Sequence, residues 1–179
     1  SCSFLYDNGY INGLLVICPN GVKGTWVKEI ETHMPDHVDR NVIVWTGQKT
    51  KKHEEELQTL FSVDSVHFNI LIMNVDAFTT DRGKKFADKF LMTRQAVLSV
   101  DESTVIKNST ALRTKAITKL GNLARYRVIM TGSPITKSPE DLYAQCNFLN
   151  HELLGFSSIY TFRARYCQMQ RLSFGGRSF

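Results

Sequence analysis

Short apolar runs alternate with longer amphipathic stretches along the first three quarters of the chain. Each run has four or five residues and is rich in Val, Ile and Leu, with apolar residues at consecutive positions. Consecutive apolar positions are typical of strands that are buried on both faces, as in a parallel sheet. We therefore expect five such strands, at Leu14–Cys18, Val42–Trp45, Ile70–Met73, Ala96–Val100 and Val128–Thr131.

The stretches between the runs carry apolar residues at helical spacing, and Phe86, Phe90 and Leu91 lie on one side of such a helix. Alternating strands and helices predict βαβ units that wind into a doubly wound, mainly parallel α/β sheet. The helices are expected at Gly24–Met34, Lys51–Phe61, Asp81–Gln95, Ser109–Asn122, Pro139–Asn150 and from about Ser158. The pattern predicts one α/β domain over residues 1–179, with a helical extension over 139–179.

The composition is that of an ordinary globular protein, since 42% of the 179 residues are hydrophobic and 22% are charged. It excludes a disordered chain, a collagen-like fibre and a disulfide scaffold. No apolar run approaches the roughly 20 residues of a membrane helix, and the first residues do not resemble a signal peptide. We expect an intracellular location, cytoplasmic or nuclear, no membrane partner, and four reduced cysteines without zinc-binding spacing.

The net charge of +5 permits an acidic partner such as nucleic acid. Four arginines and no acidic residue lie in Tyr160–Phe179, interleaved with aromatic residues. One interpretation is a surface that contacts phosphates and bases. The other, which we favour, is an amphipathic terminal helix with its aromatic side chains packed inward.

The most informative polar residues follow the fourth apolar run, where Asp101 and Glu102 are adjacent. Ligands of an open parallel sheet bind beyond the carboxyl ends of its strands. Adjacent side chains diverge as they leave a strand, so the two acids can take different roles. In phosphoryl-transfer sites one acid holds a magnesium ion and a second group orients the attacking water. The alternative is a solvated pair that begins a turn.

Four segments, in order along the chain, resemble the motifs of the superfamily two helicase-like ATPases, most closely the Swi/Snf-type branch. VICPNGVKGTWVKEI is similar to motif Ia, ILIMNVDAF to motif Ib, VLSVDESTVIKN to the DEAH-like motif II, and RVIMTGSPI to motif III. DLYAQCNFLN and FRARYC resemble the helical stretch that follows in that family. The resemblance covers nearly the whole chain and implies the first of two RecA-like lobes.

The resemblance implies a motor that uses ATP and Mg²⁺ to move on nucleic acid, with double-stranded DNA as the usual track. Asp101 would coordinate the magnesium ion on the nucleotide phosphates, and Glu102 would orient or activate the hydrolytic water. The segment Thr131, Gly132 and Ser133 would lie at the nucleotide and couple its state to the nucleic-acid site. The residues implied along the nucleic-acid backbone are Pro19, Asn20, Gly21, Lys23 and Asn74.

The sequence departs from the family pattern at three points. Thr104 stands where DEAH-type members have His, and Ser133 replaces the usual Thr. No GxxxxGK[ST] phosphate-binding loop is present, because the similar ending at Thr46–Thr50 lacks the first glycine and reads as a strand-exit loop. We expect a piece of a first lobe that lacks this loop and also lacks the second lobe with its arginine finger. Such a piece alone is expected not to hydrolyse ATP.

Two other functions stay open from the sequence. One is a non-catalytic RecA-like module that binds nucleic acid or protein. The other is an unrelated doubly wound enzyme that uses Asp101 and Glu102 with magnesium, which would make the other motif similarities coincidental.

Overall fold

The computed structural model describes residues 2–62, 67–102, 106, 112–135 and 138–167, together with the backbone of 173–174 and 177–178. Thr104 and the expected helix start at Ser109 lie outside the described residues, as do the arginine and aromatic side chains after Cys167.

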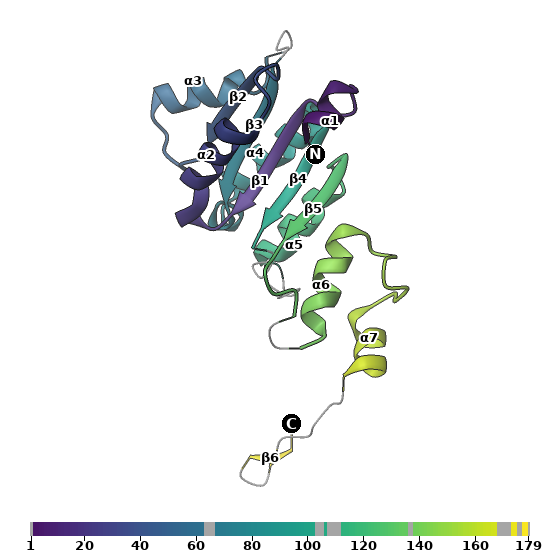
Figure 1. Cartoon of the computed structure of the whole chain (residues 1–179). Coiled ribbons are helices and arrows are strands. Elements are labelled where there is room, and N and C mark those ends of the chain that lie inside the picture. The colour runs from purple at the N-terminus through teal and green to yellow at the C-terminus, as the bar shows by residue number, and fades with distance from the viewer. Residues whose placement is uncertain are drawn as a thin grey trace.

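A five-stranded sheet forms the centre of the molecule, and all of its strands pair in parallel (Figure 1). The spatial order is β2-β3-β1-β4-β5, so the chain first winds to one side of β1 and then to the other. This arrangement confirms the doubly wound parallel sheet. The strands are β1 (Gly13–Cys18), β2 (Arg40–Val44), β3 (Phe68–Asn74), β4 (Ala96–Asp101) and β5 (Tyr126–Met130).

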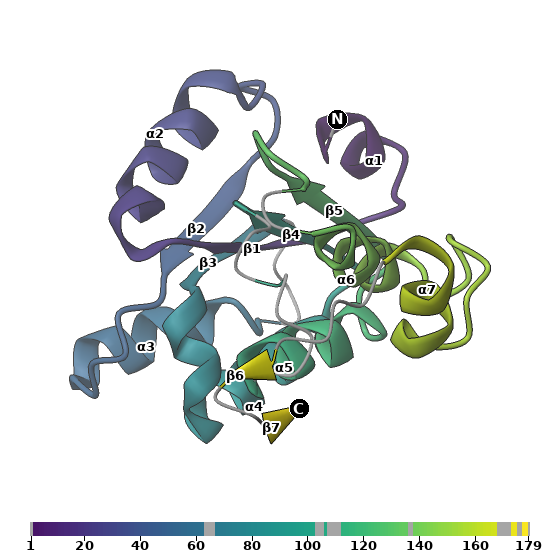
Figure 2. The same ribbon diagram turned by 90° about the horizontal axis from the view of Figure 1, so that it is seen from below.

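Helices cover both faces of this sheet (Figure 2). One face carries α1 (Cys2–Asp7) and α2 (Lys23–His33), and the other carries α3 (Lys51–Thr59), α4 (Asp81–Thr93) and α5 (Leu112–Gly121). Two short 3-10 helices follow the carboxyl ends of β1 and β3, at Asn20–Val22 (η1) and Val75–Thr79 (η2). The expected elements are therefore present, and their bounds differ by at most two residues where the structure describes them.

The position of β1 at the centre of the sheet explains why its sequence is continuously apolar. All six residues of β1 are buried, and successive side chains of a strand point to opposite faces. Leu15 and Ile17 belong to the core under α3, α4 and α5, whereas Leu14 and Val16 belong to the core under α1 and α2. A polar residue at any of these positions would be buried between two layers.

Two helices form the carboxyl-terminal part of the chain up to Tyr166. The helices α6 (Glu140–Leu149) and α7 (Ile159–Tyr166) are followed by two short antiparallel strands, β6 (Ser173–Phe174) and β7 (Arg177–Ser178). The helical end expected over 139–179 is present as α6 and α7, whereas the described backbone at 173–174 and 177–178 is paired as strands. Backbone pairing between two-residue strands leaves no hydropathy pattern, so the sequence does not reveal it.

In the described part of the arginine and aromatic segment, Phe162 packs inward as we favoured, whereas Tyr160 and Tyr166 are 74% and 58% exposed. Phe162 is buried, and its ring lies 5.1 Å from that of Tyr143 on α6. Arg163 donates two hydrogen bonds of 2.7 Å to the carboxylate of Glu140. These contacts attach α7 to α6. Among the described residues, no helix is long and apolar enough to cross a bilayer.

Gly83 in the first turn of α4 gives a test of the packing between this helix and η2. A Cβ atom placed there would lie 2.2 Å from the carbonyl oxygen of Ala77, which is backbone and cannot rotate away. Gly83→Ala is expected to lower the free energy of unfolding by roughly 1 to 3 kcal/mol, as overpacking does. Urea unfolding followed by circular dichroism measures the change.

Gly24→Ala in α2 is the matched control, because a Cβ atom at Gly24 meets nothing within 4 Å. Alanine favours a helix over glycine by up to about 1 kcal/mol, so this variant should be as stable as the unsubstituted chain or more so. Equal losses in the two variants would contradict the close approach of α4 to η2.

Cys18 at the end of β1 gives a second test. Burial and, to a lesser extent, the nearby carboxylate of Asp101 raise the pKa of its thiol to about 11, while Lys23 opposes the shift. A thiol pKa above its unfolded value of 9.0 means that the folded state holds the proton more tightly. The stabilisation is therefore complete below about pH 9 and is lost as the pH rises towards 11.

The measurement compares the unsubstituted chain with Cys18→Ala by urea unfolding at pH 8, 9, 10 and 11. The stability of the unsubstituted chain relative to the variant should fall across this range, because the Cys18 thiol loses its proton whereas alanine at that position has none to lose. A difference that stays constant with pH would show that the thiol is not shielded as the structure indicates.

Candidate functional site

The centre of the sheet contains the point where the chain changes its winding direction. The chain leaves β1 through α2 on one face, whereas it leaves β4 towards α5 on the other face (Figure 2). Connections that depart to opposite faces leave a crevice at the carboxyl ends of the two strands, and this is where open α/β sheets bind ligands. Asp101 is the last residue of β4 and therefore lies at this crevice.

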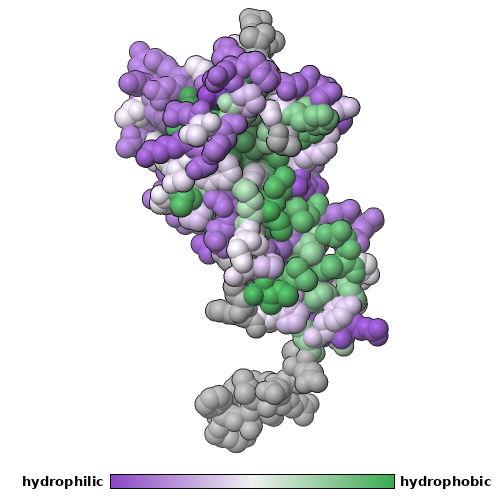
Figure 3. All heavy atoms as spheres, in the orientation of Figure 1, coloured by the Kyte–Doolittle hydropathy of each residue, from purple (hydrophilic) through white to green (hydrophobic). Residues whose placement is uncertain are grey.

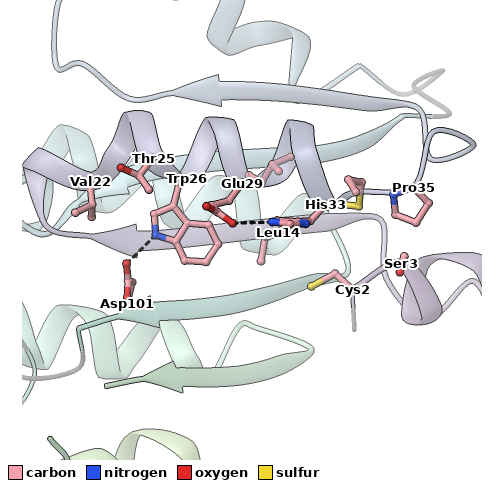
Figure 4. A pocket seen from close by; sticks show the side chains of 12 residues that line it. Cys2, Ser3, Leu14, Val22, Thr25, Trp26, Glu29, His33, Pro35 and Asp101 are labelled. Atoms are coloured by element: carbon pink, nitrogen blue, oxygen red, sulfur yellow. Dashed lines mark hydrogen bonds and ion pairs between the residues drawn. The ribbon is translucent and has the colours of Figure 1, made fainter. Parts of the chain in front are cut away.

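A cleft of about 550 Å³ runs along α2 between α2 and α1, with Asp101 at one end (Figure 4). Its walls are apolar over most of their length and include Leu14 of β1 and the ring of Trp26. Its acidic and basic groups are the carboxylate of Asp101 and a pair formed by Glu29 and His33, whose Oε2 and Nε2 atoms are 3.1 Å apart.

Both carboxylate oxygens of Asp101 accept hydrogen bonds. The indole Nε1–H of Trp26 donates to Oδ2 over 2.7 Å, and the backbone N–H of Glu102 donates to Oδ1 over 2.9 Å. Two donors to different oxygens fix the plane of the carboxylate. Sequence reasoning missed this contact, which joins positions 75 residues apart.

Glu102 has a backbone φ of 51°, the left-handed value that non-glycine residues rarely adopt. Among the residues that the structure describes, it is the one non-glycine residue with a positive φ. This turn separates the two acids, as expected: Asp101 meets Trp26, whereas Oε1 of Glu102 lies 3.5 Å from the hydroxyl of Thr131 at the end of β5. Rare backbone conformations of this kind cluster at functional sites.

The segment after β5 is held by its own hydrogen bonds and by α6. The N–H of Ser133 donates to the hydroxyl of Thr131 over 3.2 Å. The amide of Gln145 donates to the carbonyl oxygens of Pro134 and Asp141, over 2.6 and 2.9 Å. Gln145 is only 1% exposed. It therefore positions the loop that contains the family-implied nucleotide contacts, a role that sequence reasoning missed.

The residues implied along nucleic acid gather at the carboxyl ends of β1 and β3. Asn74 pairs in register with Cys18, so it lies beside the segment that begins at Pro19. Asn20 and Gly21 are exposed in η1. The Nζ atom of Lys23 donates to the carbonyl oxygen of Trp45 over 3.4 Å, which places this ammonium group over the end of β2.

The sequence-predicted residues thus form two neighbouring groups along one edge of the sheet. The nucleotide group follows β4 and β5 and consists of Asp101, Glu102, Thr131, Gly132 and Ser133. The nucleic-acid group follows β1 and β3 and consists of Pro19, Asn20, Gly21, Lys23 and Asn74. The hydrogen bond between Trp26 and Asp101 joins the helix of the second group to the acid of the first.

The loop after β2 is a strand-exit loop, as expected, and side chains of α4 and α3 hold its backbone. Arg82 of α4 donates to the carbonyl oxygens of Gly47 and Gln48, over 2.9 and 3.2 Å, and also pairs with Glu54. The hydroxyl of Thr50 caps α3 by accepting the N–H of His53.

The chemistry of the site fits a magnesium ion. Among the described residues, no group of three His, Cys, Asp or Glu side chains could hold a metal by itself. Magnesium does not need one, since it usually binds one or two carboxylates together with water and substrate phosphates. A carboxylate has about four lone-pair positions, and the two hydrogen bonds to Asp101 leave the others for an ion or its water.

Comparisons with known proteins agree with this geometry. The chain is 27% identical to a Caenorhabditis elegans homolog of SWI/SNF-related matrix-associated actin-dependent regulator of chromatin subfamily A-like protein 1. That match covers 86% of this chain and 20% of the relative. It is 30% identical to the Homo sapiens helicase-like transcription factor, over 75% of this chain and 12% of the relative. The chain therefore spans about a fifth of these relatives or less.

Among solved structures, the fold is similar to that of the Sulfolobus solfataricus SWI2/SNF2 ATPase core in complex with dsDNA. The TM-score is 0.65 at 23% identity, and the match covers 92% of this chain and 30% of the other. The model of the SNF2-related domain matches residues 5–170, which include both groups of site residues. The chain belongs to the SNF2-related domain family.

Proposed function

We propose that this chain is part of the motor domain of an ATP-dependent, helicase-like DNA translocase. The observation that carries the proposal is the acid pair at the winding switch of the sheet. Asp101 and Glu102 leave β4 in different directions, towards the nucleic-acid helix α2 and towards the loop after β5. A motor that links nucleotide hydrolysis to movement needs its catalytic acids at such a junction.

Each residue of the nucleotide group has a role that its position supports. Asp101 would hold Mg²⁺, which neutralises charge on the nucleotide phosphates when it is bound. Glu102 would accept a hydrogen bond from the attacking water and orient it. The hydroxyl of Thr131 lies 3.5 Å from Oε1 of Glu102, so a shift of the loop after β5 would change the hydrogen bonding of that carboxylate.

Double-stranded DNA is the partner that we propose for the nucleic-acid group. Small polar side chains and backbone amides contact phosphates without reading the base sequence. The net charge of +5 favours such a partner. The related SWI2/SNF2 ATPase core has been solved with dsDNA. Contacts of this kind suit a protein that moves along DNA instead of recognising one site.

The exposed edge of the sheet supports a larger assembly. Tyr126 and Val128 on β5 are 37% and 42% exposed, and β5 pairs with β4 on one side only in the described sheet. Apolar surface continues over β5 and α6 in Figure 3. We propose that further sequence of the same polypeptide covers this edge and supplies the phosphate-binding loop and a second RecA-like lobe. We place the protein in the cytoplasm or the nucleus.

A second function, a non-catalytic module that binds DNA or protein, is favoured by one observation. The 179 residues contain no GxxxxGK[ST] loop, which is the main phosphate anchor of such ATPases. The first experiment distinguishes the two functions.

ATPase activity is measured with and without double-stranded DNA, on this chain alone and on the complete polypeptide. The chain alone should show no turnover, because it lacks the loop and the arginine finger, which alone is worth about 10³–10⁵ in rate. The complete polypeptide should show DNA-stimulated turnover that falls by roughly 10²–10⁴ in Glu102→Gln, as expected for loss of a general base.

Glu55→Gln is the control, since Glu55 is an exposed residue of α3 whose one recorded ion pair is with Lys51 at 3.9 Å. It should leave the rate unchanged. DNA binding without turnover by the complete polypeptide would overturn the motor function in favour of the binding module.

DNA binding by the nucleic-acid group is tested through Lys23→Ala, measured by fluorescence anisotropy of a labelled duplex at several salt concentrations. One lost phosphate contact should make the slope of log K against log salt shallower by about 0.9. The binding should weaken similarly for duplexes of different sequence.

Lys119→Ala is the matched control. Lys119 is an exposed residue in the last turn of α5, which ends where β5 begins, so it lies at the opposite edge of the sheet. An unchanged slope in Lys23→Ala, or the same change in both variants, would contradict the proposed position of the DNA.

A further inference from the structure

We propose that Trp26 is a positioning residue that couples nucleic-acid engagement to the orientation of the Asp101 carboxylate. The inference rests on the proposed function for its catalytic consequence, but the contact itself does not. The indole N–H of Trp26 would act as a latch between the nucleic-acid group and the nucleotide group.

The contact has the geometry of a strong hydrogen bond. The distance from Nε1 to Oδ2 is 2.7 Å, which is at the short end for a nitrogen donor. The acceptor is a carboxylate, and charge-assisted bonds are roughly twice as strong as neutral ones. Figure 4 shows the indole reaching across the cleft from α2 to the end of β4.

The second carboxylate oxygen of Asp101 is also held, so that two hydrogen bonds together fix the orientation of the group. Oδ1 is held by the backbone N–H of Glu102 over 2.9 Å. Without the indole, one hydrogen bond remains and the carboxylate can rotate about it. Trp26 therefore selects one rotamer of Asp101 through contact with Oδ2.

The position of Trp26 on its helix links this rotamer to DNA. Lys23 begins α2, and Trp26 follows three residues later, which is about one helical turn. A helix moves as a rigid unit over one turn. A shift of the segment from Pro19 to Lys23 on binding DNA would therefore displace the indole and, with it, the carboxylate of Asp101.

Packing alone does not explain a tryptophan here. Trp26 is half-buried and borders the open cleft, and its ring packs on the outside of the core under α1 and α2. Phenylalanine supplies a similar ring without the N–H. Trp26→Phe therefore removes the latch and keeps most of the apolar contact.

The contact is tested first by NMR on this chain, which contains only two tryptophans, Trp26 and Trp45. Their indole N–H resonances are assigned with Trp26→Phe and Trp45→Phe. In Asp101→Ala, the Trp26 resonance should move upfield and exchange faster with solvent, while that of Trp45 stays in place. Asp101→Asn, which keeps the shape of the side chain, should give a smaller shift in the same direction.

Asp81→Ala, an exposed acid of α4, is the control and should move neither resonance. A Trp26 resonance that is unchanged in both Asp101 variants would overturn the hydrogen bond, and with it the inference.

The coupling is tested in the complete polypeptide by DNA-stimulated ATPase. Loss of a hydrogen bond to a charged group typically changes an equilibrium or rate constant by a factor of about ten to a hundred. Trp26→Phe should therefore lower the DNA-stimulated kcat by roughly tenfold or more, and raise the Mg²⁺ concentration for half-maximal activity. The DNA concentration for half-maximal stimulation should change little, because the variant removes no DNA contact.

Trp45→Phe is the matched control. Trp45 is buried and packs on Phe86 and Arg82, away from Asp101, so its loss perturbs the core without touching the latch. An equal kcat in Trp26→Phe and Trp45→Phe would overturn the coupling and leave the proposed function intact. Absence of turnover in the unsubstituted polypeptide would overturn both, even where NMR confirms the bond.

Discussion

β1 lies between β3 and β4 with every residue buried, and the rest of the structure depends on covering it on both faces. A parallel strand in this position needs crossover connections, and these connections must be helices that carry an apolar side. The requirement places α1 and α2 on one face and α3, α4 and α5 on the other. It also gathers the carboxyl ends of all five strands along a single edge, which is where the candidate catalytic and binding residues lie.

The switch of winding direction decides which of those residues meet. β1 sends the chain to one face and β4 leads it to the other, so Asp101 lies beside the first turns of α2 although the two are distant in sequence. The left-handed conformation of Glu102 then turns the second acid towards Thr131. Two adjacent carboxylates thereby face two different parts of the molecule. This separation gives a physical basis for linking nucleotide chemistry to a nucleic-acid surface.

Burial decreases from the middle of the sheet to its edges. β1, β3 and β4 are almost completely buried, whereas β2 and β5 are partly exposed. The chain matches the SNF2-related domain over residues 5–170 but spans only about a fifth of its relatives or less. Apolar surface lies over β5 and α6, at the partly exposed edge of the sheet (Figure 3).

The sequence by itself determined the five strands, the helices between them, the parallel sheet and the strand ends at which the site lies. Hydropathy reports burial on one or two faces, and that is what distinguishes these elements. It missed the short strands β6 and β7 and the first two residues of β2 and β3, where Asn41 and Asn69 interrupt the apolar pattern, because backbone pairing does not depend on apolar side chains. The apolar pattern located the two acids and the resemblance to the family implied their roles, but only the tertiary structure decided their partners. The bonds from Trp26 to Asp101 and from Gln145 to Pro134 join residues whose proximity depends on strand order and on which face each helix covers. No local pattern encodes such a contact, since a Trp on a helix and a Gln on a helix look the same whether they fill a core or hold a site.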